Sequence, residues 1–143
     1  MILDTKDSAM EILDLTSFEK VVKSLESIII RFETENDIDL RDSVIQRFEY
    51  TFSMSLKMIK RFLKQTELSE EELNGMIFSE IIRKANQYNL IKTNLETWDE
   101  YRQKRNMTSH TYDEETAQKV MSIIPAFKDE AEFLLNRLKE RLG

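Results

Sequence analysis

Apolar side chains recur along this chain at the spacing of an amphipathic helix, and charged residues fill most positions between them. One stripe runs from Phe18 to Phe32 at intervals of three and four residues, and a second runs from Val44 to Leu63. A shorter stripe covers residues 78–88, and the last runs from Ala117 to Leu142. This period of about 3.6 residues predicts a chain that is helical along most of its length.

Four Ser or Thr residues followed three positions later by Glu mark expected helix starts, since such pairs can satisfy the free N–H groups of a first turn. They are Thr16/Glu19, Ser69/Glu72, Thr93/Glu96 and Thr111/Glu114, and Asp39 is a further N-cap. The expected helices are 16–34, 39–65, 69–89 with a break allowed near Gly75, 93–109 and 112–141, the last kinked at Pro125. Short connections then predict an all-α fold, an antiparallel up-down bundle of about five helices.

The composition removes other folds and several chemistries. Two glycines and one proline are too few for the turns of a β or a parallel α/β fold. The absence of cysteine excludes disulfides and thiolate metal sites, and a single histidine excludes a multi-histidine site within one chain. We therefore expect no metal and no cofactor. The length predicts one domain over residues 1–143, of which 1–15 form an N-terminal extension.

No segment has the pattern of a membrane span or a secretion signal. The N-terminal residues include Asp4, Asp7 and Glu11, and the longest purely apolar run, Ile28–Ile30, is far shorter than the roughly 20 residues of a span. We expect a cytoplasmic protein without membrane contact. The net charge of −6 also differs from that of proteins that coat nucleic acid, so we expect no DNA partner, and any polyanion must bind a local patch.

One basic patch falls on the second expected helix. Lys57, Lys60, Arg61 and Lys64 share a helix face, and no acidic residue occurs between Tyr50 and Thr66. These side chains either form a solvated face whose charges complement the helix dipole or contact phosphates, Lys57 and Arg61 above all. Both interpretations stay open from the sequence.

The densest polar chemistry lies before the last expected helix. Arg105, Asn106, Ser109, His110 and Tyr112 fall within eight positions, shortly after Arg102. An arginine that can grip a phosphate and a histidine that titrates near neutrality are parts for metal-free phosphodiester cleavage. The alternative is a structural histidine at a helix junction, with nearby carboxylates already at the helix terminus. Cleavage needs both an acid and a base, so one histidine per chain points to a two-fold dimer.

The spacing of Arg105, His110 and Tyr112 resembles the signature of the HEPN domain family. The chain is most similar to the subgroup of nucleotidyltransferase substrate-binding proteins, which pair with a minimal nucleotidyltransferase. The segments RFEYTFSMSLKMIKRFL from Arg47, IIRKANQYNLI from Ile81, and Trp98 before RNMTSHTYDEETA carry the likeness. It covers roughly residues 16–140, although Leu56 stands where the subgroup usually has an aromatic residue.

The resemblance implies a dimeric helical bundle with Arg105 and His110 of both protomers around a shared cleft. Many HEPN proteins are metal-independent endoribonucleases, while others in the subgroup are described only as subunits that bind nucleotide or substrate for the nucleotidyltransferase. In related toxin–antitoxin modules the nucleotidyltransferase silences its partner by adenylylating a tyrosine, here Tyr112. A ribonuclease with Arg105 and His110 as catalytic residues is the first hypothesis, and Arg102, Asn106, Ser109, Lys57 and Arg61 would contact RNA or nucleotide. A non-catalytic binding subunit is the alternative, and a relict helical interaction protein is the third.

Overall fold

The structure is a computed structural model that describes residues 14–66 and 68–142. These residues form six α-helices and one 3-10 turn, which confirms the all-α fold. The elements are α2 (Thr16–Glu35), α3 (Ile38–Thr66), α4 (Glu70–Asn74), α5 (Phe78–Gln87), α6 (Leu95–Asn106), η1 (Thr108–His110) and α7 (Glu114–Leu142). Residues 1–13 of the expected N-terminal extension lie outside the described residues.

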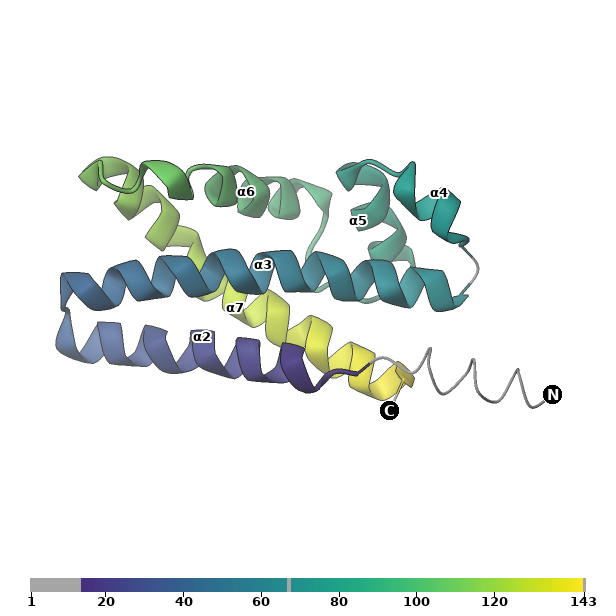
Figure 1. Ribbon diagram of the computed structural model, residues 1–143, viewed down its shortest axis with the longest axis horizontal. Helices are drawn as coiled ribbons and strands as arrows, with labels where there is room; N and C mark the ends of the chain where they lie inside the picture. Colours follow the sequence, from purple (N-terminus) through teal and green to yellow (C-terminus); the bar gives the residue numbers. More distant parts are fainter. Residues whose placement is uncertain (1–13, 67, 143) are drawn as a thin grey trace.

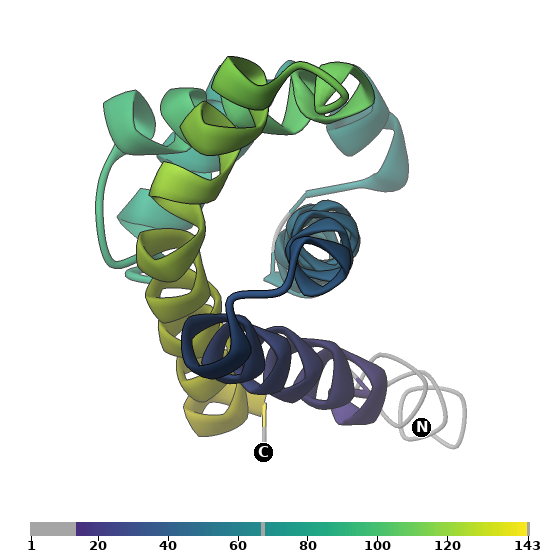
Figure 2. The ribbon, with the colours of Figure 1, turned by 90° about the vertical axis from the view of Figure 1, so that its left-hand side faces the viewer.

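Helices α2, α3 and α7 form the body of the bundle. Figure 1 shows α2 and α3 side by side in opposite directions, with α7 crossing both obliquely. Figure 2 looks along α3 and shows α2, α7 and the group formed by α5 and α6 around three of its sides, while no described helix covers the fourth. The long helix α3 therefore packs into the core on three sides and faces the molecular surface on the fourth.

Aromatic rings fill the middle of this core. Phe127 of α7 makes edge-to-face contacts with Phe48, Trp98 and Tyr101, at centroid distances of 5.2, 6.0 and 5.1 Å. Edge-to-face pairs contribute about 0.5–1.5 kcal/mol beyond the area they bury. They fasten α6, which carries Trp98 and Tyr101, to the two long helices.

A buried carboxylate adds a polar link between α7 and α6. Glu130 is 0% exposed and accepts a hydrogen bond from the backbone N–H of Lys92 at 2.6 Å, just before α6. It also accepts from the hydroxyl of Thr93 at 2.5 Å and from that of Tyr101 at 3.4 Å. Burial, together with the Glu130 charge, raises the pKa of the Tyr101 phenol.

The break allowed near Gly75 in the helix expected over 69–89 is present, because the chain leaves α4 at Gly75 and becomes extended at Ile77, where ψ is 166°. One expected boundary is wrong in detail. The helix expected over 93–109 ends at Asn106 and continues as η1. The last helix passes through Pro125 without a break.

Of the four expected capping boxes, only Ser69/Glu72 forms. Asn94 caps α6 in place of Thr93, and α2 has no side-chain cap. The sequence pattern locates the helices correctly, but it does not decide which neighbouring polar group takes the terminal N–H.

Candidate functional site

The polar segment expected to carry chemistry lies where α6 turns through η1 into α7. The His110 N–H donates to the carbonyl of Met107 at 3.0 Å, and the His110 carbonyl accepts from the N–H of Asp113 at 3.1 Å. The hydroxyl of Thr108 donates to the carbonyl of Arg105 at 2.8 Å. These bonds hold Arg105 and His110 on one short, ordered turn.

Arg105 reaches across to α3. Its Nη1 lies 3.6 Å from Oε2 of Glu49, and both side chains are about one third exposed. This separation is an ion pair without a hydrogen bond, and pairs of this exposure contribute only about 0–1 kcal/mol. The guanidinium is thus oriented toward α3 while its other donors stay available to a phosphate.

His110 and Tyr112 lie side by side on the outer surface of the turn. Their ring centroids are 6.1 Å apart with an interplanar angle of 75°. Tyr112 is 87% exposed, and the His110 imidazole has no hydrogen-bond partner within the described residues. The expectation that Tyr112 sits in the first turn of the last helix is wrong, because α7 begins at Glu114.

The N-terminus of α7 is occupied by the protein's own carboxylates. Asp113 accepts hydrogen bonds from the hydroxyl and the N–H of Thr116, at 2.8 and 3.0 Å, which lower the pKa of Asp113. Thr111, expected as the cap, instead donates its hydroxyl to the carbonyl of Thr108 at 3.2 Å. A helix end suited to an anion is therefore already capped.

A polar groove of about 600 Å³ separates this turn from the first half of α3. Its walls include Glu49, Tyr112 and the ion pair of Arg41 with Glu114, whose Nη1 and Oε2 atoms are 2.6 Å apart. Hydrogen bonding to Arg41 lowers the pKa of Glu114, and the same bond raises that of Arg41. The groove thus brings Tyr112 together with Glu49, the partner of Arg105.

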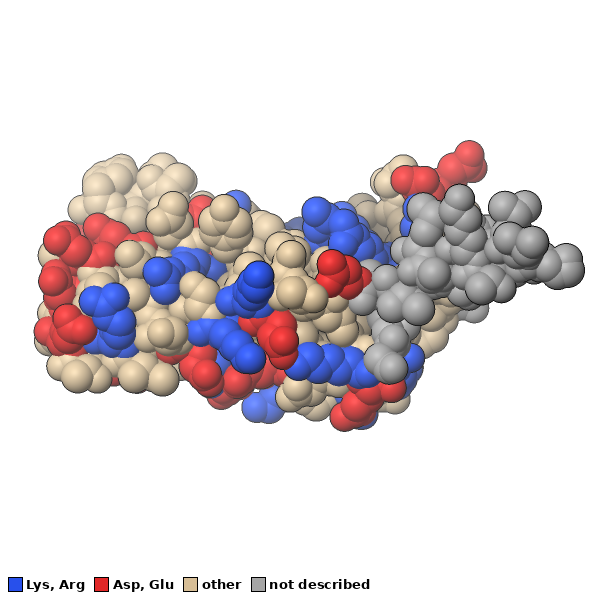
Figure 3. All heavy atoms as spheres, turned by 60° about the horizontal axis from the view of Figure 1, so that its bottom comes forward, with Lys and Arg blue, Asp and Glu red and all other residues tan. Residues whose placement is uncertain are grey.

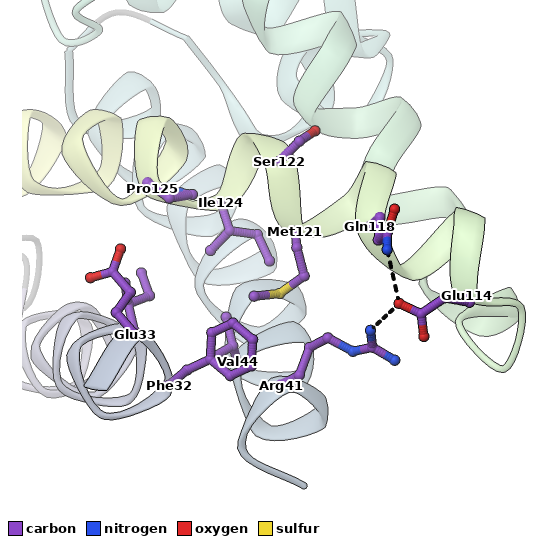
Figure 4. Close-up of a pocket in the computed structure, with 11 residues that line it drawn as sticks. Phe32, Glu33, Arg41, Val44, Glu114, Gln118, Met121, Ser122, Ile124 and Pro125 are labelled. Carbon is purple, nitrogen blue, oxygen red and sulfur yellow. Dashed lines mark hydrogen bonds and ion pairs between the residues drawn. The ribbon is translucent and has the colours of Figure 1, made fainter. Parts of the chain in front are cut away.

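The same ion pair also borders a second cavity of about 420 Å³ between α2, α3 and α7 (Figure 4). Its floor is apolar and includes Phe32, Val44 and Ile124. The Nε of Arg41 is buried and has no hydrogen-bond acceptor within the described residues. Arg41 and Glu114 therefore form a shared wall between an apolar cavity and the polar groove.

The remaining expected contact residues are divided between the site and other places. Asn106 and Ser109 are exposed beside Arg105 and His110. Arg102 packs instead over the ring of Phe78, at 4.5 Å from its centroid. Lys57 and Arg61 are exposed on α3, about 12 and 18 Å along the axis beyond Glu49, so they lie outside the groove.

The sequence does not indicate that Glu49, Arg41 and Glu114 belong to the groove, although Glu114 appears in an expected capping box. Glu49 lies 56 positions before Arg105 and alternates with core residues of α3, so nothing local marks it. Arg41 and Glu114 are 73 positions apart and meet only when α7 folds against α3.

Among the described residues, no group of three or more His, Cys, Asp or Glu is arranged to hold a metal ion. No helix in that part of the chain is long and apolar enough to cross a membrane.

Comparison with known proteins assigns the chain to a family. A family model described as "Nucleotidyltransferase substrate binding protein like" matches residues 13–140. The chain belongs to this family. The resemblance seen in the sequence to the nucleotidyltransferase substrate-binding subgroup is therefore confirmed.

Two further comparisons, one by sequence and one by structure, match the chain to Haemophilus influenzae proteins. A protein named "Probable ribonuclease HepT" is 35% identical over 138 residues, which cover 90% of this chain and 94% of the relative. A solved structure, described as the fold of a substrate binding domain of a nucleotidyltransferase, is 34% identical with a TM-score of 0.81. The match covers 88% of this chain and 99% of the chain in that structure.

Proposed function

We propose that this chain is the HEPN component of a two-protein, toxin–antitoxin-like module with a minimal nucleotidyltransferase, and that it is a metal-independent endoribonuclease. The observation that carries the proposal is the ordered turn that carries Arg105 and His110, five residues apart, next to a polar groove lined by Glu49 and Tyr112. The relative named a probable ribonuclease supports the same chemistry. The active site is completed by a second copy of the chain.

In this mechanism His110 takes the proton of a ribose 2′-hydroxyl, and the 2′-oxygen attacks the neighbouring phosphorus. The bond from phosphorus to the 5′-oxygen breaks, and His110 of the second copy donates a proton to that oxygen. Arg105 stabilises the charge that builds on the phosphoryl oxygens. The products are a 2′,3′-cyclic phosphate and a 5′-hydroxyl.

The test is incubation of the purified protein with mixed cellular RNA in EDTA. We expect cleavage that leaves cyclic phosphate ends, and light scattering should give the mass of a dimer. His110→Ala should lower the rate by about 10²–10⁴-fold, Arg105→Ala should lower it comparably, and Gln87→Ala, at an exposed position on α5, should not. A monomer at every concentration, or unchanged activity in His110→Ala, would contradict the composite site.

Tyr112 is proposed as the point of control. Its exposed phenol attacks the α-phosphorus of ATP in the nucleotidyltransferase, which releases pyrophosphate and leaves AMP on the ring. The added phosphate and purine then occupy space beside His110, where the RNA phosphate would bind. The modified protein is folded but inactive.

Mass spectrometry after mixing the protein with its nucleotidyltransferase, ATP and Mg²⁺ tests this control. We expect a gain of whole AMP units and loss of ribonuclease activity. Tyr112→Phe should show no gain, whereas Tyr50→Phe, at another exposed tyrosine, should behave as wild type. An equal gain in Tyr112→Phe would refute the assignment.

A second candidate function is a non-catalytic subunit that binds nucleotide or substrate for the nucleotidyltransferase. The net charge of −6 favours it, since a free ribonuclease gains from long-range attraction to RNA. The description of the solved relative as a substrate binding domain agrees. Nucleotide binding by a wild-type protein that turns over no RNA would select this function.

A further inference from the structure

No described helix covers one side of α3 (Figure 2). Gln46, Tyr50, Lys57 and Arg61 are spaced by four, seven and four residues, which places them on one helix face, and all four are exposed. We name these four residues the α3 stripe. It begins beside the groove and runs toward the C-terminal end of α3.

The stripe combines an exposed ring with two cations, of which Arg61 also attracts the carboxylate of Asp14. Tyr50 is 63% exposed. Within the described part of the chain Lys57 and Arg61 form no ion pair, whereas Lys64, one turn further along, lies 3.7 Å from Glu70. The stripe is therefore a local positive surface on an acidic protein.

A cavity of about 400 Å³ lies beside Tyr50, between α2 and α3, and extends this surface. Lys20, Arg47 and Tyr50 line it, and no carboxylate does. Arg47 donates from Nη1 to the carbonyl of Ser24 at 3.2 Å, so its guanidinium is held in place before any ligand arrives. Gln46 lines both this cavity and the polar groove, so the two are neighbours on the surface of α3.

We infer that the α3 stripe, with Lys20 and Arg47, is a track for single-stranded RNA that leads away from the groove. This inference rests on the proposed function, because it assigns the path of the substrate. Cations along a groove with an exposed aromatic ring form a surface that binds single strands, since every base has a face that can stack. Phosphates contact the cations, one base stacks on Tyr50, and binding depends little on base sequence.

Charge sets the direction of the track. Acidic side chains gather at the end of the bundle where α2 meets α3, while basic side chains are spread along the middle of the same face (Figure 3). Glu33, Glu35, Asp37 and Asp39 lie in and around that connection. A polyanion leaving the groove is repelled there and drawn toward Tyr50. From Tyr50 to Arg61 the track measures about 17 Å, on the order of five stacked nucleotides.

The test measures binding of labelled oligonucleotides in which every 2′-hydroxyl is methylated, so that no cleavage can occur. Tyr50→Ala should weaken binding by about 5- to 150-fold, and Tyr50→Phe should bind as wild type. Lys57→Ala/Arg61→Ala should lower the slope of log affinity against log salt by about 1.4. Arg83→Ala/Lys92→Ala removes two exposed cations from α5 and the loop after it, and should leave that slope unchanged.

The controls separate this inference from the proposed function. Full oligonucleotide binding by His110→Ala supports the track, whether or not this variant still cleaves RNA. Wild-type protein without affinity for the oligonucleotide, or Tyr50→Ala with unchanged affinity, overturns the track. A Tyr50→Ala protein that becomes monomeric but keeps its affinity for the oligonucleotide also overturns the track, because this face would then be an interface between copies.

Discussion

Replacing Glu130 by alanine tests whether a buried carboxylate fastens α6, and with it Arg105, to α7. The side chain is 0% exposed and accepts three hydrogen bonds, from Lys92, Thr93 and Tyr101. Its removal leaves the buried Tyr101 hydroxyl without an acceptor, at about 1–3 kcal/mol. The Lys92 and Thr93 donors lie nearer water and add about 1 kcal/mol each.

The expected loss of unfolding free energy for Glu130→Ala is therefore about 3–5 kcal/mol, in the range seen when one partner of a buried polar pair is removed. For a chain of this size about 3 kcal/mol corresponds to a fall in Tm of roughly 10 °C. Thermal unfolding followed by circular dichroism measures it. Glu130→Gln should lie between alanine and wild type, because the amide keeps one acceptor oxygen but turns N–H groups toward a donor.

Two control comparisons make this prediction specific to the buried carboxylate. Glu140→Ala removes an exposed carboxylate of α7 that pairs with Arg137, and it should change stability by less than about 0.5 kcal/mol. Tyr101→Phe should cost about 1 kcal/mol in wild type and much less in Glu130→Gln, since the hydroxyl then lacks its carboxylate. A Glu130→Ala protein that melts within 2 °C of wild type would refute the reasoning.

Three further predictions concern the site. The hydrogen bond from Arg41 lowers the pKa of Glu114, so the pair stabilises the fold above the unfolded pKa of Glu114, and this stabilisation is lost as the pH falls through the folded pKa. Arg41→Met should therefore reduce the slope of unfolding free energy against pH in the acid range. Asp113→Ala should lower the Tm more than Asp113→Asn, which keeps an oxygen for the Thr116 N–H, and equal values would exclude the cap. Arg105→Lys should retain the fold but lower RNA cleavage, since an ammonium cannot fork onto a phosphate, and an unchanged rate would contradict a role for Arg105 in binding it.

The helices could be read from the sequence because each long one has an apolar stripe that this core buries. Local signals were less reliable wherever a residue had a distant competitor. Thr93 was expected to cap a helix, but it donates to Glu130, which lies 37 positions later. The break at Gly75–Ile77 had only one glycine to indicate it.

The candidate site shows the same division. Arg105, His110 and Tyr112 are neighbours in sequence, so their proximity could be predicted, although their roles stay predictions. Glu49, which orients Arg105, comes from α3 and carries no local signal. Lys57 and Arg61 were grouped with the site by charge, yet the rise of the helix separates them from the groove.

The hydrogen-bonded turn between α6 and α7 also limits how many residues can separate the two helices. Between Arg105 and Asp113 the backbone is bonded at Met107, His110 and Asp113. A residue inserted here would break one of these bonds or displace the start of α7, which carries the buried side chains of Val120, Ile124 and Phe127. The spacing between the arginine and the histidine is therefore constrained by folding itself, before any substrate is considered.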